Sequence, residues 1–157
     1  MSLVLESGNK VVHKTHGVGE IQGTEVLQLG GQSQDYYILK ILATGLKVRF
    51  PMQASSAIVR SLVDELQIAE ILEIIASPAK SYSMVWNRRK KEFNEKINSG
   101  SIFDIAEVYR DLHNKDDGKE LSFGEKEMLE KAKLRLVSEI AAARSVPEQE
   151  VEQMIGS

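Results

Sequence analysis

Residues 46–51 read LKVRFP, an alternation of apolar and basic side chains that ends in proline. A period of two puts the three apolar side chains on one face of a strand and leaves Lys47 and Arg49 on the other. Proline has no backbone N–H for a sheet ladder, so Pro51 predicts the end of this strand. The stretch therefore predicts a strand with one face in a core and one basic face in solvent.

The chain before this stretch has the composition of a small β-domain. Up to about Arg60 it is rich in Gly, Val, Ile, Leu and Tyr, and turn signals recur at short intervals. Gly30-Gly31 suits a tight hairpin, because such turns need the positive φ that glycine adopts readily. Gly17-Val18-Gly19 lacks the third glycine of a dinucleotide-binding loop and is more typical of a bent strand. Residues 1–60 are predicted to form a small, strongly bent β-barrel or sheet.

From Ser61 the pattern changes to helix. Apolar residues recur at helical spacing, with breaks at Ser77-Pro78, Asn98-Ser99-Gly100, Asp116-Asp117-Gly118 and Val146-Pro147. Four pairings of the capping-box kind predict helix starts: Asp64 with Gln67, Ser101 with Asp104, Ser122 with Glu125, and Ser145 with Glu148. The predicted fold class is α+β in two domains, with an all-α compact bundle of about five helices over residues 61–157 and a close junction near residues 58–63.

Composition excludes several classes of protein. The chain has 157 residues, a net charge of −3 and no cysteine, which excludes disulfides and thiolate chemistry. No apolar run is long enough to span a membrane, and the N-terminus does not read as a signal peptide, so we expect a cytoplasmic protein. His13 and His16 have no carboxylates at ligand spacing, and no catalytic triad or paired carboxylates stand out. We expect no metal, no cofactor and no enzymatic activity.

Trp86 is the only tryptophan, and it stands directly before a basic run. Residues 61–157 hold 14 Lys and Arg against 19 Asp and Glu, yet Lys80 to Lys91 holds five cations and no anion. An aromatic ring beside cations is suited to nucleic acid, because cations hold phosphates while the ring meets base planes. The candidate DNA-binding residues are Trp86, Arg88, Arg89, Lys90 and Lys91.

Each of these features also has a structural interpretation. Trp86 shares a helical stripe with Phe93 and Ile97, so periodicity alone also fits a core residue. The basic run also fits a solvated helix face with i,i+4 ion pairs, such as Arg88 with Glu92. Arg49 lies where strand pairing should stop. It therefore fits either an edge that accepts a partner's strand or an ordinary solvent-facing position.

Several segments together resemble a known family. They are residues 8–12 (GNKVV), 17–19 (GVG), 37–41 (YILKI), 48–51 (VRFP), 86–89 (WNRR), 105–108 (IAEV), 110–112 (RDL) and 121–126 (LSFGEK). In order and without large gaps, from about residue 6 to residue 144, they resemble the bacterial CarD/CdnL family of RNA polymerase-binding transcription regulators. The tryptophan segment and the Leu-Ser-x-Gly-Glu segment carry most of the specificity.

The resemblance implies a role for each half. A Tudor-like β-domain, similar to the polymerase-interacting domain of transcription-repair coupling factor, would dock on the β-subunit lobe of RNA polymerase. The helical domain would reach promoter DNA at the upstream edge of the transcription bubble. There Trp86 would wedge into the minor groove, with Arg88 and Lys91 near the backbone and no sequence-specific readout. The implied polymerase-binding residues are Ile38, Leu39, Lys47, Arg49 and Pro51.

The resemblance further implies a monomer in the cytoplasm, associated with the nucleoid through RNA polymerase. The chain departs from the family at His13-Lys14, where Tyr-Pro is common, and at Lys90, where an aromatic is common. Leu27 stands where some relatives carry a basic polymerase-contacting residue. The competing function is a protein–protein adaptor on the transcription machinery, without DNA contact, in which Trp86 would be a protein hot spot.

Overall fold

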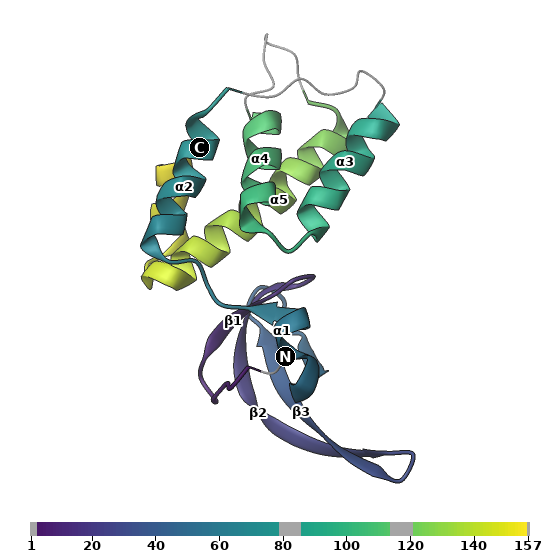
Figure 1. Cartoon of the computed structure of the whole chain (residues 1–157). Coiled ribbons are helices and arrows are strands. Elements are labelled where there is room, and N and C mark those ends of the chain that lie inside the picture. Colours follow the sequence, from purple (N-terminus) through teal and green to yellow (C-terminus); the bar gives the residue numbers. More distant parts are fainter. Residues whose placement is uncertain (1–2, 79–85, 114–120, 157) are drawn as a thin grey trace. The chain divides into compact units, whose positions relative to one another are not determined.

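The computed structural model describes residues 3–78, 86–113 and 121–156 (Figure 1). The chain divides into two compact units, Met1–Leu62 and Val63–Ser157. Within the described residues, the first unit carries all of the strands, and the second carries only helices. The predicted α+β class is confirmed, and the division falls beside the boundary predicted after residue 60.

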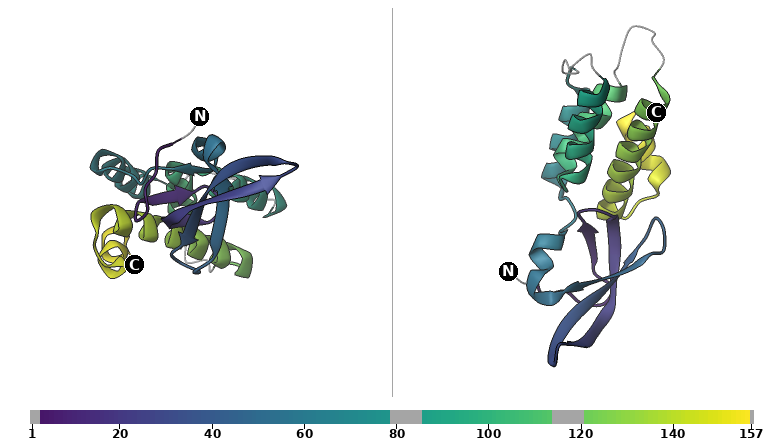
Figure 2. Two further views of the ribbon diagram at one scale, coloured as in Figure 1. Left: turned by 90° about the horizontal axis from the view of Figure 1, so that it is seen from below. Right: turned by 90° about the vertical axis from the view of Figure 1, so that its right-hand side faces the viewer.

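The first unit is built on one antiparallel sheet. Its strands are β1 (Lys10–His13), β2 (Gly17–Leu29), β3 (Gln32–Ile41), β4 (Lys47–Pro51) and β5 (Val59–Arg60), in the order β4-β3-β2-β1-β5. A 3-10 turn, η1 (Met52–Ala54), and a short helix, α1 (Ser55–Ile58), join β4 to β5. β4 ends at Pro51, as predicted. β2 and β3 continue beyond the other strands as a twisted two-stranded arm (Figure 2).

The arm closes in the predicted glycine turn. β2 ends at Leu29 and β3 begins at Gln32, which leaves Gly30 and Gly31 as the two loop residues. Their φ angles are 58° and 79°. Both lie in the left-handed region required by the hairpin turn whose twist matches the strands. The prediction for Gly30-Gly31 is confirmed.

A compact apolar core lies on one face of the sheet. Its buried members are Val11, Ile21, Tyr37, Leu39, Ile41, Phe50 and Val59. The Tyr37 hydroxyl donates to the Leu3 carbonyl at 2.9 Å and accepts from the Leu5 backbone N–H at 3.1 Å. These two bonds fasten the N-terminal segment to the sheet.

Gly19 lies against this core, where its missing side chain is essential. A Cβ at this position would lie 2.7 Å from both Cγ and Cδ1 of Leu39. We therefore expect Gly19→Ala to destabilise the β-unit by about 1–3 kcal/mol, the usual cost of overpacking. Thermal unfolding would measure the loss.

Leu39 supplies the control for this prediction. Leu39→Ala removes the clashing atoms, so the double variant Gly19→Ala/Leu39→Ala should lose less stability than the two single losses added together. Strictly additive losses would show that the contact between Gly19 and Leu39 is not the cause.

The second unit is a bundle of helices around its own core. The helices are α2 (Glu65–Ala76), α3 (Trp86–Asn98), α4 (Ile102–His113), α5 (Phe123–Arg144) and α6 (Glu148–Ile155). The buried core draws on all of them and includes Ile68, Phe93, Tyr109, Leu136 and Val151. Burial of the Tyr109 phenol, followed by the nearby Glu130 charge, raises its pKa, and its hydroxyl lies 2.8 Å from the Gly156 carbonyl oxygen.

The predicted helix starts have mixed outcomes. Complete capping boxes are present at Asp64 with Gln67 and at Ser122 with Glu125. At the start of α4, the Asp104 backbone N–H lies 3.5 Å from the Ser101 hydroxyl, which is a weak version of the predicted cap.

The capping box predicted for Ser145 is wrong. Ser145 instead closes α5 in a left-handed conformation, φ 56° and ψ 47°, and its N–H donates to the Ala141 carbonyl. Pro147 is the N-cap of α6. A residue that precedes proline avoids helical angles, so a helix could not begin with Val146.

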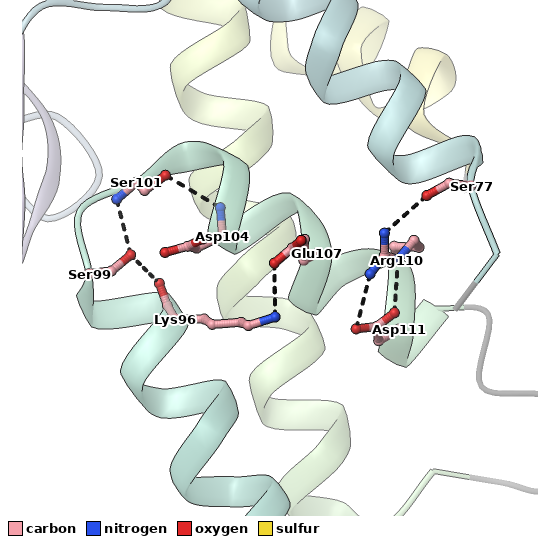
Figure 3. Close-up of polar contacts among 8 residues, drawn as sticks. All are labelled: Ser77, Lys96, Ser99, Ser101, Asp104, Glu107, Arg110 and Asp111. Atoms are coloured by element: carbon pink, nitrogen blue, oxygen red, sulfur yellow. Dashed lines mark hydrogen bonds and ion pairs between the residues drawn. The ribbon is translucent and has the colours of Figure 1, made fainter. Parts of the chain in front are cut away.

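Buried and half-buried polar contacts tie the helices together. Arg110 on α4 pairs with its neighbour Asp111 at 2.8 Å and donates to the hydroxyl of Ser77, at the end of α2, at 3.0 Å (Figure 3). Lys96 on α3 binds Glu107 on α4 at 2.8 Å. Buried Glu139 accepts from the Val63 backbone N–H at 3.0 Å and so anchors the first residue of this unit to α5.

Candidate functional site

The strand register brings four of the predicted polymerase-binding residues to one face of the sheet. Ile38 lies opposite Arg49, and Tyr36 lies opposite Pro51. Opposed residues of an antiparallel pair share a face, as do residues two apart in a strand, so Lys47 also belongs here. We call this surface the outer face. It faces away from the core, and Lys47 and Arg49 are exposed on it.

Leu39 is the fifth predicted residue, and its side chain does not lie on the outer face. Its side chain is 0% exposed and packs in the core on the opposite face. The reason is the period of two in β3, which turns Leu39 inward because its neighbour Ile38 is turned outward. Leu39 can support the outer face but cannot offer its side chain to a partner.

Arg49 has a partner that sequence reasoning missed. Its Nε donates to a carboxylate oxygen of Glu25 on β2, and both side chains are partly exposed. Glu25 pairs in register with Tyr36, so the ion pair reaches across β3 on the outer face. The alternation along β3 that puts Ile38 on the outer face also puts Tyr36 there, and this alternation can be read from the sequence. The pairing of Glu25 with Arg49 depended on strand order.

β4 is an edge strand of this sheet. It pairs with β3 on one side and stands at the end of the strand order. An edge strand has backbone N–H and C=O groups that can pair with a strand of another protein. The outer face and this edge together form one candidate protein-binding surface.

The basic run Arg88–Lys91 lies in the first half of α3, and its members differ in exposure. Trp86 is the first residue of α3, and its side chain lies outside the described residues, as does Lys80. Arg88, Lys90 and Lys91 are exposed. These three cations form the second candidate surface, suited to phosphate groups.

Arg89 differs from its neighbours. It is partly buried, and its Nη2 lies 3.7 Å from Oε2 of Glu125 on α5. This contact brings the first turn of α5 beside the N-terminal half of α3. Phe123, the first residue of α5, is a 79% exposed aromatic side chain that the sequence analysis did not include among the candidate surface residues. Its place directly after the Ser122 cap was a usable signal, because such a position need not point into the bundle.

Two other features are absent from the described parts of the chain. Over residues 3–78, 86–113 and 121–156, no group of three or more His, Cys, Asp or Glu side chains could hold a metal ion. Within the same ranges, no helix combines the length and the apolar character of a membrane span.

Comparison with known proteins accounts for both units. Residues 5–63 match the model of the CarD-like/TRCF RID domain, and residues 70–156, more than half of the chain, match that of the CarD C-terminal domain. This chain belongs to the CarD/CdnL family. It is therefore a member of a family of transcription factors. The resemblance found in the sequence is confirmed.

Three individual proteins are similar to this chain or to part of it. YdeB of Bacillus subtilis (strain 168), which is named provisionally as a transcription factor, is 28% identical over 149 residues, 94% of this chain and 97% of its own. The solved N-terminal domain of CdnL from Myxococcus xanthus is 32% identical, over 41% of this chain and 93% of its own, with a TM-score of 0.35. The solved N-terminal domain of Myxococcus xanthus CarD is 26% identical, over 39% of this chain and 87% of its own length, with a TM-score of 0.32.

Proposed function

We propose that this CarD/CdnL protein docks on the β-subunit lobe of RNA polymerase as a monomer and stabilises the open promoter complex. The β-unit holds the polymerase, and the helical unit contacts promoter DNA at the upstream edge of the bubble. Trp86 is the wedge, and Arg88, Lys90 and Lys91 face phosphates. The observation that carries the proposal is that both domain models of this family match, in order, along one chain.

The outer face supports the first contact. Its surface combines the half-buried side chains of Ile38, Tyr36 and Pro51 with the cation of Arg49, and it borders the edge strand β4. Apolar contacts flanked by a charge, next to an unpaired strand edge, suit a partner that adds a strand and supplies an acidic group. The CarD-like/TRCF RID model implies RNA polymerase as that partner.

Tethering explains how a weakly basic surface can act on DNA. Three exposed cations on a chain of net charge −3 make few phosphate contacts. Docking on polymerase raises the local DNA concentration towards the millimolar range of linked sites, so weak contact suffices. A wedge that fits the distorted fork better than closed duplex by ~1–2 kcal/mol changes open-complex occupancy roughly 5- to 30-fold.

The free protein should therefore bind linear duplex DNA poorly and without sequence preference. We expect micromolar or weaker affinity in moderate salt, because few counterions are released on binding. Fluorescence anisotropy with labelled duplexes of unrelated sequence would measure this. Nanomolar, sequence-selective binding by the free protein would contradict the tethered mechanism.

Crosslinking within the polymerase–promoter complex tests the proposal directly. The protein should be retained by purified RNA polymerase and crosslink to DNA at the upstream bubble edge. The DNA crosslink should weaken with salt before polymerase binding is lost. Polymerase binding without any DNA crosslink at low salt would favour the protein–protein adaptor instead.

A further inference from the structure

The two halves of α3 are attached to the bundle in different ways. Among the described residues of this helix, those buried in the core are Phe93 and Ile97. The ion pair between Lys96 and Glu107 also lies in the C-terminal half. In the N-terminal half, the described side chains of Arg88, Lys90 and Lys91 are exposed, and none of the side chains described there belongs to the apolar core.

Arg89 provides a contact for this N-terminal half. It reaches from the first turns of α3 to Glu125 in the first turn of α5. The half-buried guanidinium and the buried carboxylate are shielded from solvent, so their attraction is less screened than that of an exposed pair.

Glu125 is itself held in place. It is 2% exposed, and its Oε1 accepts from the Ser122 backbone N–H at 3.0 Å. In return, the Glu125 backbone N–H donates to the Ser122 hydroxyl at 3.2 Å. The capping box therefore orients the carboxylate, whose second oxygen, Oε2, lies 3.7 Å from Nη2 of Arg89. A buried carboxylate also requires a cation or hydrogen bonds to offset its lost hydration.

We infer that Arg89 and Glu125 are positioning residues that fix the direction of the first turns of α3, and with it the placement of Trp86. Arg89 acts through Glu125 and not through a phosphate, unlike the exposed Arg88. The effect on promoter complexes rests on the function proposed above, whereas the effect on Trp86 can be measured in the free protein.

Glu125→Gln isolates the charge. Glutamine preserves the capping box, because its side-chain oxygen can still accept from Ser122, but it removes the attraction to Arg89. Trp86 is the only tryptophan, so time-resolved fluorescence anisotropy of the free protein reports on this position alone. We expect a larger amplitude of nanosecond depolarisation in Glu125→Gln. Arg89→Met keeps an apolar side-chain stem and should increase the depolarisation amplitude in the same way. Glu127 is exposed on the same turn as Glu125, so the control Glu127→Gln should leave the amplitude unchanged.

Combined variants separate positioning from phosphate contact in the polymerase–promoter complex. Arg89→Met and Glu125→Gln should each shorten the open-complex lifetime roughly 3- to 10-fold, and together no more than either alone, because they break one interaction. The effect of Arg88→Gln on the open-complex lifetime should multiply with that of Glu125→Gln. Arg88→Gln should also lower the salt dependence of the DNA crosslink, whereas Arg89→Met should leave that salt dependence unchanged.

The outcomes distinguish this inference from the proposed function. Unchanged Trp86 anisotropy in both Glu125→Gln and Arg89→Met, or multiplicative effects of these two changes, would overturn the inference. Increased Trp86 motion with unaltered promoter complexes would support the positioning contact, and it would count against the Trp86 wedge.

Discussion

Trp86→Ala should shorten the lifetime of open promoter complexes roughly 5- to 30-fold, the range set by a ~1–2 kcal/mol preference for the distorted fork. The free variant should nevertheless melt almost as the parent does, and it should still bind polymerase. The physical reason is the place of Trp86 as the first residue of α3, where a side chain can project past the end of a bundle. Promoter lifetimes after a competitor challenge would measure the loss.

Phe93 is the matched control on the same helix. It is 2% exposed in the core, so Phe93→Ala should destabilise the protein by about 3–5 kcal/mol. If Trp86→Ala lowers the melting temperature as much as Phe93→Ala does, Trp86 is a core residue. If it leaves the bubble fully stabilised, the wedge assignment is wrong.

Arg49→Glu should weaken binding to RNA polymerase by about 30-fold or more, since loss of one partner in a buried charged contact costs roughly 2–5 kcal/mol. The new carboxylate would also lie beside Glu25, in place of the present ion pair. DNA contact outside the polymerase complex should not change. Affinity for the isolated β-subunit lobe, measured calorimetrically, would test this.

A charge swap separates folding from binding at this position. Glu25→Arg/Arg49→Glu can restore an ion pair across β3, so its melting temperature should return towards that of the parent. Its polymerase affinity should remain low, because the cation is now on β2. Recovery of both stability and polymerase affinity in the double variant would mean that Arg49 acts only within the sheet. Unchanged polymerase affinity in the single variant Arg49→Glu would remove Arg49 from the interface.

Local signals in the sequence were sufficient for the broad architecture. Gly30-Gly31 predicted the hairpin, because few other residues tolerate two positive φ angles in succession. Pro51 predicted the end of β4, and Ser122 predicted the start of α5. Each signal works through the backbone of its own segment and needs no distant partner.

One predicted helix start failed because a neighbouring constraint was stronger than the local pattern, and a similar constraint places Leu39 on the inner face of the sheet. Ser145 matched the spacing of a capping box, but Pro147 prevents Val146 from starting a helix. Leu39 matched a family segment, but its parity in β3 turns it into the core. Both constraints could be read from the sequence, because each depends on neighbouring residues of the same segment.

The sequence by itself therefore determined the two units, the family and the alternation that puts Ile38 and Arg49 on one face. Only the tertiary structure decided which charges have partners. Glu25 meets Arg49 because β2 and β4 flank β3, and Glu125 meets Arg89 because α5 begins beside α3. The reason is physical: backbone preferences act over a few residues, whereas the partner of a charged side chain depends on which distant segment the packing brings within a few ångströms.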